Sequence, residues 1–182
     1  MSYPPIQYIP FAIDYPTQAF NRLWNELQWD RRGSTPRREY YCNDVNVPYT
    51  YGSGSGIRTY EPRLMHPVIA QIKSDCELIM NTKFEVVFLN GYENSRDHLG
   101  WHADDSPEMD DTRPICIVSL GAEREIWFRP QNDKDEVTKL VLQHGSLCVM
   151  EAGMQDTHYH RIPKASFECG PRISITLRGY TE

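Results

Sequence analysis

The sequence predicts a mostly β protein with flanking helices, in which two helices pack on a β sandwich or barrel. Helical periodicity is confined to two segments in the first half of the chain, residues 16–28 and the stretch that begins at Pro67. Beyond residue 83 the pattern changes to short runs rich in Val, Ile, Phe and Thr, separated by Gly, Pro or Asn-Asp. This change of period indicates that strands follow the helices.

Both helices have an apolar stripe. In residues 16–28 the stripe consists of Phe20, Leu23, Trp24 and Leu27. The second helix is expected to begin near Pro67, because proline suits the first turn of a helix. Its expected buried face consists of Val68, Ile69, Ile72, Cys76, Ile79 and Met80.

Six later segments are predicted to be strands: residues 84–90, 115–120, 123–129, 137–143, 146–150 and 172–178. In the first of them every second residue points to the same side, and this shared face consists of Phe84, Val86, Phe88, Asn90 and Tyr92. The amide and the phenol at its end are placed to hydrogen-bond a polar group. The alternative is that the strand simply ends there and the chain becomes solvated.

The last predicted strand alternates polar and aliphatic residues. Its polar face consists of Arg172, Ser174, Thr176 and Arg178. A buried guanidinium is costly unless it is paired, and its fork of donors matches a carboxylate. The two arginines can therefore converge on a diacid, or they can pair with Asp or Glu side chains at the mouth of a barrel.

Composition limits the classes of protein that remain. The chain has 182 residues, 40% hydrophobic and 24% charged, which favours one globular domain and excludes a disordered chain. Five cysteines without a Cys-x-x-Cys pair argue against a disulfide framework and a zinc ribbon, so a reducing, intracellular and cytoplasmic location is expected. No apolar run could span a bilayer, and no secretory signal is apparent. With a net charge of −6, any nucleic-acid partner would need a local basic patch.

An unusual segment, residues 33–62, lies between the two predicted helices. It combines a glycine-serine run at residues 52–56 with five tyrosines: Tyr40, Tyr41, Tyr49, Tyr51 and Tyr60. Four arginines lie just before or within it: Arg31, Arg32, Arg37 and Arg38. One interpretation is a surface hairpin whose tyrosines pack on the core. The other is a mobile flap whose aromatic rings stack on a flat ligand while its arginines contact phosphates.

A possible metal site is indicated by His102, Asp104 and the distant His160. In an extended segment residues i and i+2 point to one side, so His102 and Asp104 can present donor atoms to the same point. Two histidines with one carboxylate leave open positions on a metal and are typical of non-haem Fe(II) oxygenases. Taken singly, each histidine of the chain could equally be structural, and the His-x-Asp pattern alone is weak.

The order of these motifs resembles the AlkB family of Fe(II)- and 2-oxoglutarate-dependent dioxygenases, over about residues 36–178. The resemblance is carried by Asn90-Gly91-Tyr92, Trp101-His102-Ala103-Asp104-Asp105, Ser119-Leu120-Gly121-Ala122, His144-Gly145-Ser146-Leu147, residues 150–155, His160-Arg161-Ile162-Pro163-Lys164 and residues 171–178. Pro36-Arg37 and Tyr49-Thr50-Tyr51 are similar to the substrate-binding flap of the family.

The resemblance implies a role for each matching residue. His102, Asp104 and His160 would bind Fe(II), with His158 as a competing ligand. The residues that would hold 2-oxoglutarate are Asn90, Tyr92, Arg172, Ser174, Thr176 and Arg178, with Arg172 on the distal carboxylate. Asp105 would be a catalytic acid that also contacts the base, and the other substrate-binding residues would be Tyr41, Tyr49, Tyr51 and Arg37. Ser106 stands where the best-known DNA-repair members often have a glutamate, which leaves the base preference open. Ser174 replaces an asparagine that is common in the family, a change that a polar face tolerates.

The resemblance also implies a fold and an activity. The fold would be one dioxygenase domain over residues 1–182, a double-stranded β-helix (jelly-roll) core with the N-terminal helices packed on one sheet and residues 33–62 as a nucleotide-recognition flap. With Fe(II), 2-oxoglutarate and O2 it would demethylate N-alkylated bases of DNA or RNA, releasing formaldehyde, succinate and CO2. Single strands are weakly favoured, and a monomer without membrane association is expected. The alternatives are a dioxygenase of the same fold acting on a protein side chain or a small molecule, and a non-catalytic β-barrel binding module.

Overall fold

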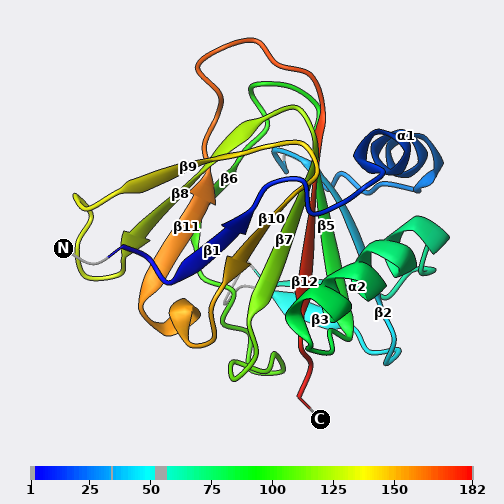
Figure 1. Ribbon diagram of the computed structural model, residues 1–182, viewed down its shortest axis with the longest axis horizontal. Helices are drawn as coiled ribbons and strands as arrows, with labels where there is room; N and C mark the ends of the chain where they lie inside the picture. Colours follow the sequence, from blue (N-terminus) through cyan, green and yellow to red (C-terminus); the bar gives the residue numbers. More distant parts are fainter. Residues whose placement is uncertain (1–2, 34, 52–56, 182) are drawn as a thin grey trace.

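The computed structural model describes residues 3–33, 35–51 and 57–181, with Tyr51 described by its backbone alone. Two antiparallel sheets face each other (Figure 1). The larger sheet has the order β1 (Ile6–Ile9), β10 (Ser146–Met150), β7 (Ile115–Gly121), β12 (Arg172–Arg178), β5 (Val86–Tyr92) and β2 (Arg38–Asn43). The smaller sheet has the order β6 (Leu99–His102), β11 (His158–Ile162), β8 (Arg124–Pro130) and β9 (Thr138–Leu142). A short hairpin is formed by β3 (Tyr49–Tyr51) and β4 (Arg58–Tyr60).

From β5 to β12 the chain passes back and forth between the two sheets, and only the β8–β9 connection stays within one of them. This is the strand arrangement of a double-stranded β-helix, so the predicted jelly-roll class is confirmed. The helices α1 (Pro16–Glu26) and α2 (Pro67–Met80) lie against the outer face of the larger sheet (Figure 1). The predicted starts of both helices are confirmed. Ile79 was expected on the buried face of α2, but it is 44% exposed in the last turn of that helix.

The main hydrophobic core lies between the helices and the larger sheet. Leu23 of α1 and Ile72 of α2 pack there with the aliphatic face of β12. Phe84 belongs to this core together with Val87 and Leu89, so the expectation that it shares a face with Val86 is wrong. The reason is that β5 begins only at Val86, and regular alternation does not extend back to residue 84.

The opposite face of the larger sheet carries the polar residues of β12. Ser174 pairs in register with Asn90, and Arg172 with Tyr92, so the polar positions of β12 and β5 lie next to each other. All seven residues of β12 are buried. The space between the two sheets therefore contains these polar side chains beside a hydrophobic cluster that includes Ile117 and Phe128, which positions a site inside the molecule.

Two further features concern the cysteines and the helices. None of the five cysteines forms a disulfide, and four of them are buried. Within the parts of the chain that the structure describes, no helix has the length and apolar character needed to span a membrane.

Gly121, at the end of β7, provides a test of the connection from the sheet to α1. Its φ is +92°, and an added Cβ would lie 2.5 Å from the carbonyl oxygen of Pro171 and 2.8 Å from the ring of Phe20. Both the positive φ and the contact disfavour a side chain, so we expect Gly121→Ala to lower the free energy of unfolding by about 2–4 kcal/mol. Urea denaturation of the two proteins measures the difference.

Gly170→Ala is the matched control, because a Cβ at Gly170 meets no atom within 4 Å and its φ is not in the left-handed region. We expect this control to change the free energy of unfolding by less than about 0.5 kcal/mol. Equal midpoints for Gly121→Ala and the unchanged protein would contradict the assigned packing.

Candidate active site

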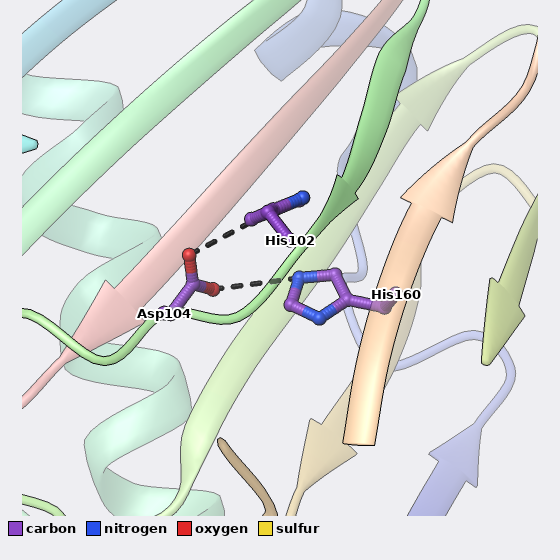
Figure 2. Close-up of side chains that lie close together, drawn as sticks. All are labelled: His102, Asp104 and His160. Atoms are coloured by element: carbon purple, nitrogen blue, oxygen red, sulfur yellow. Dashed lines mark ion pairs between the residues drawn. The ribbon is translucent and has the colours of Figure 1, made fainter. Parts of the chain in front are cut away.

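The three predicted donor residues converge between the sheets. His102 is the last residue of β6 and pairs in register with His160 in the middle of β11, while Asp104 follows two residues after His102. Nε2 of His102 lies 3.6 Å from Oδ1 of Asp104, and Nε2 of His160 lies 3.5 Å from its Oδ2. Figure 2 shows the carboxylate pointing toward both imidazole rings. One donor atom from each residue lies within 4.8 Å of the others, an arrangement that could hold one metal ion.

The orientation of His102 is set by the backbone. Its Nδ1 lies 2.8 Å from the carbonyl oxygen of Gly100, which can only accept, so Nδ1 carries the hydrogen and Nε2 presents its lone pair toward Asp104. The backbone N–H of Asp104 donates to Oε1 of Gln155 at 2.9 Å. Gln155 belongs to a short 3-10 helix, η2 (Met154–Asp156), which therefore holds the segment that carries the carboxylate.

Charge in the site is balanced by Arg178. Burial alone would raise the pKa of Asp104, but the guanidinium of Arg178, with Nη2 at 3.1 Å, and the two imidazoles hold that pKa well below its usual range. Burial and the neighbouring His160 lower the pKa of His102 to about 3. At neutral pH the carboxylate is charged and His102 is neutral, and these are the protonation states in which both residues bind a metal.

Arg172 is a buried cation with unused donors. Its Nη2 donates to Oγ of Ser119 at 2.8 Å, whereas Nε and Nη1 have no hydrogen-bond partner in the described part of the chain. The buried hydroxyl of Tyr92 likewise has no partner, and the guanidinium carbon of Arg172 lies 5.2 Å from the Tyr92 ring centroid. Burial lowers the pKa of Arg172 to about 10, so it stays charged at neutral pH. These unused donors fit a carboxylate of a small ligand.

The remaining polar residues expected to hold the ligand lie on the same inner face. Ser174 and Thr176 are buried on β12, and Asn90 is buried on β5. Oδ1 of Asn90 accepts from Nε of Arg37 at 3.0 Å. The set predicted from the alternation of β12 is therefore brought together, and Arg37 joins it from the N-terminal side of β2.

A pocket lies beside His102, Asp104 and His160, which together form the donor trio. It is lined by His102, Asp104 and Arg178 on the metal side, and by Glu39, Tyr49 and Tyr60 among the residues opposite. The hydroxyl of Tyr49 accepts from Nη1 of Arg178 at 2.7 Å. The pocket therefore connects the donor trio with the β3–β4 hairpin.

The tyrosines expected to bind substrate differ in their placement. Tyr49 lines the pocket, but Tyr41 is buried behind it, with its ring stacked on Tyr49 at 5.6 Å and its hydroxyl donating to the carbonyl of Val47. The side chain of Tyr51 and the glycine-serine run of residues 52–56 lie outside the described residues. The expected flap, residues 33–62, is therefore not a single unit. Residues 38–43 form β2 of the larger sheet, and residues 49–51 and 58–60 form the β3–β4 hairpin.

Asp105 is exposed and lies on the wall of a neighbouring hollow, which it shares with Asp104 and Arg178. Ser106 beside it donates to the hydroxyl of Tyr49 at 3.2 Å. His158, the competing ligand, places Nδ1 2.8 Å from Oγ1 of Thr157 and is not part of the donor cluster found among the described residues.

The arginines expected to contact phosphates have partners within the chain. Arg31 pairs with Asp97 at 2.6 Å, and Arg38 pairs with Glu93 at 2.7 Å. The guanidinium of Arg32 lies 4.3 Å from the centroid of the Tyr60 ring. The charges of Arg31 and Arg38 are therefore partly neutralised in this conformation, whereas Arg32 is paired with no carboxylate among the described residues.

Sequence analysis missed two charged residues that shape the site. Glu39 lies on β2, two residues from each of the predicted site residues Arg37 and Tyr41. This spacing of two could have indicated that its side chain points to the same side as theirs. Arg124 is 2% exposed and donates to the carbonyls of Asn94, Asp97 and Pro163, which fixes the segments around β6 and β11. Its alternation with the buried Ile126 and Phe128 could have marked it as an inward-facing arginine.

Comparisons with known proteins agree with this geometry. Residues 14–178 match the family model described as the 2OG-Fe(II) oxygenase superfamily. The chain is 32% identical over 174 residues to "DNA oxidative demethylase ALKBH2" of Mus musculus, covering 91% of this chain and 70% of that protein. Against the Homo sapiens protein of the same name it is 31% identical over 173 residues, covering 91% and 64%.

A second group of relatives carries another name. The Bos taurus "Alpha-ketoglutarate-dependent dioxygenase alkB homolog 3" is 31% identical over 177 residues, covering 88% of this chain and 60% of that protein. The chain thus spans about 60 to 70% of the length of these curated relatives. The solved structure described as "The structure of OsALKBH1" has a TM-score of 0.62 at 14% identity, covers 99% of each chain and supports the fold.

The donor trio can be tested by metal binding alone. We expect Asp104→Ala to weaken Mn²⁺ binding at least about 100-fold, because two imidazoles without the carboxylate provide neither its charge nor its oxygen. Isothermal titration calorimetry of the metal-free protein measures the affinity. Asp133→Ala, which removes a carboxylate at an exposed position, is the control and should bind Mn²⁺ as the unchanged protein does. Tight binding by Asp104→Ala would refute the trio.

Proposed function

Since the chain belongs to the AlkB family within the 2OG-Fe(II) oxygenase superfamily, we propose that it oxidatively demethylates N-alkylated bases of DNA or RNA. The observation that carries this proposal is the donor trio placed beside a buried guanidinium with unused donors. The first feature fits Fe(II), and the second fits the far carboxylate of 2-oxoglutarate. The nucleic-acid substrate is drawn from the names of the relatives, which describe DNA demethylases.

His102, Asp104 and His160 would hold Fe(II). With 2-oxoglutarate and O2, the bound iron supplies the oxidation of a C–H bond of the N-alkyl group, with release of succinate, CO2 and, after demethylation, formaldehyde. The protein contributes a fixed set of donors: Gly100 orients the ring of His102, and Arg178 keeps the carboxylate charged. The imidazole of His102 and the carboxylate of Asp104 would therefore bind the metal without a prior proton transfer.

Arg172 and Tyr92 would hold the distal carboxylate of 2-oxoglutarate. Ser119 accepts from one nitrogen of the guanidinium, so the two nitrogens without a partner among the described residues could donate to the ligand, and the Tyr92 hydroxyl could donate to the same carboxylate. Asn90, Ser174, Thr176 and Arg178 line the inner face of β5 and β12 and would contact the rest of the molecule. Burial of these groups excludes water from the reacting centre.

The substrate base would enter the pocket beside His102. An alkylated base must leave its stack before its alkyl group can reach the metal. Tyr49, Arg37, Tyr51 and Asp105 are the residues proposed to contact the nucleotide, and Tyr41 would act by supporting the ring of Tyr49. The recognition segment is residues 33–62 of a single domain that spans residues 1–182.

The finer parts of the proposal are a preference for single strands, a monomeric state and a cytoplasmic location. The five unpaired cysteines fit a reducing compartment. The strand preference rests on the sequence analysis alone, in which single strands are weakly favoured.

A second candidate is a dioxygenase of the same fold acting on a protein side chain or a small molecule. Two observations favour it: the net charge of −6, and the pairing of Arg31 and Arg38 with acidic side chains instead of leaving them open to phosphates. The complete donor trio gives no support to the non-catalytic binding module.

A panel of methylated DNA and RNA oligonucleotides separates these functions. With Fe(II) and 2-oxoglutarate, we expect formaldehyde release and the loss of one methyl group by mass spectrometry for at least one N-methylated base. The unmethylated oligonucleotide of the same sequence is the control. Iron-dependent succinate release that no oligonucleotide stimulates, but that a peptide or small molecule does, would establish the second candidate.

The role of Arg172 predicts a separation between two binding events. Arg172→Met should raise the 2-oxoglutarate concentration needed for half-maximal turnover at least about 10-fold, because the bidentate partner of the distal carboxylate is lost. Oligonucleotide affinity should change less than about 2-fold, since Arg172 is wholly buried between the sheets.

The matched control is Arg22→Met, the same change at an exposed guanidinium on α1. It should leave the 2-oxoglutarate requirement unaltered. Weaker oligonucleotide binding by Arg172→Met with an unchanged 2-oxoglutarate requirement would place the co-substrate elsewhere.

A further inference from the structure

Glu39 is a buried acidic residue in the substrate pocket. It lies on β2, pairs in register with Asn90 of β5 and is 1% exposed. Its Oε2 accepts from the hydroxyl of Tyr60 at 2.9 Å and lies 3.5 Å from Nη2 of Arg37. Its Oε1, although buried, accepts no hydrogen bond from the residues that the structure describes.

A buried carboxylate oxygen without a donor is costly, and such groups usually have a partner in native structures. The cation paired with this oxygen is Arg58, whose Nη1 lies 3.8 Å away, beyond hydrogen-bonding distance. The Arg58 side chain is 37% exposed, so this ion pair is partly open to solvent. The arrangement leaves Oε1 as an acceptor that a donor entering the pocket would satisfy.

The acids in and near the pocket differ in whether a substrate donor can reach them. Of the described residues that line this pocket, Glu39 and Asp104 are the two acids, and Asp104 is engaged by Arg178 and the two imidazoles. Asp105 is exposed and lies on the neighbouring hollow. Within the pocket, Glu39 is therefore the carboxylate available to a substrate.

We propose that Glu39 is a specificity-determining residue, whose Oε1 accepts a hydrogen bond from the exocyclic amino group of the alkylated base. This inference rests on the proposed function and selects among its substrates. Adenine alkylated at N1 and cytosine alkylated at N3 carry a positive charge and an amino group beside the alkylated nitrogen. Uracil alkylated at N3 is neutral and presents a carbonyl oxygen at the same place, which a carboxylate oxygen repels.

The test compares N3-methylcytosine with N3-methyluracil in one oligonucleotide sequence, because the two bases differ in charge and in an amino group against an oxygen at position 4. The unchanged protein should have the higher kcat/KM on N3-methylcytosine. Glu39→Gln should reduce this preference at least about 10-fold, since an amide carries no charge and can donate to the carbonyl of N3-methyluracil. A purely structural role would lower kcat/KM on both bases by the same factor, and that result would overturn the proposal.

Two variants sharpen the comparison. Glu61→Gln makes the same chemical change at an exposed position just after β4 and should keep the preference of the unchanged protein. Glu39→Asp keeps the charge but withdraws the oxygen by one methylene group, and it serves if Glu39→Gln does not fold. It should also reduce the preference, and an unaltered preference in both Glu39 variants would refute the assignment.

A binding measurement keeps this proposal separate from the proposed function. Fluorescence anisotropy with the metal-free protein should show that Glu39→Gln weakens affinity for the N3-methylcytosine oligonucleotide and leaves that for N3-methyluracil unchanged or improved. If the unchanged protein demethylates neither base, the anisotropy alone decides on Glu39, and the oligonucleotide panel decides on the proposed function. Suppose instead that the unchanged protein demethylates both bases, and that Glu39→Gln changes neither the ratio of the two kcat/KM values nor the ratio of the two oligonucleotide affinities. Glu39 is then excluded, while the proposed function stands.

Discussion

The site depends on the ion pair between Arg178 and Asp104, which joins the two sheets. Arg178 is the last residue of β12 in the larger sheet, whereas Asp104 follows β6 of the smaller one. A carboxylate buried to this extent would be neutral without a nearby positive charge, and a neutral acid is a poor metal ligand. The guanidinium therefore does more than hold the sheets together, because it maintains the charge that lets two imidazoles and one carboxylate act as a single donor set.

The chain separates stabilising and functional surfaces on opposite faces of the same strands. On β12, Ile173, Ile175 and Leu177 belong to the hydrophobic core beneath the helices, while the intervening residues face the other sheet. Buried donors without partners, such as those of Arg172 and Tyr92, lower the stability of the isolated fold. Core packing on the outer face offsets that cost, and a bound dicarboxylate would remove it, so ligand binding should be coupled to stability.

Regular alternation made part of this structure predictable. The seven residues of β12 and the positions of both helices follow from local patterns, because side-chain direction in a strand or helix depends on neighbouring residues. The strands that carry the histidines, β6 and β11, lack a run of Val and Ile, and they form because their partners in the smaller sheet hold them. Glu39 and Arg124 were missed although each alternates with inward-facing neighbours, because alternation alone does not show that a charged side chain is buried. The same limit applies to Tyr41, which local sequence could not assign to the layer behind Tyr49 instead of to the pocket wall.

The most direct measurement is a crystal structure of the protein grown without oxygen in the presence of Mn²⁺ and 2-oxoglutarate. The account predicts Mn²⁺ bound by Nε2 of His102, a carboxylate oxygen of Asp104 and a ring nitrogen of His160. It also predicts the distal carboxylate of 2-oxoglutarate on the guanidinium of Arg172. A metal ion held by other residues, or a dicarboxylate that leaves Nε and Nη1 of Arg172 without a partner, would contradict it.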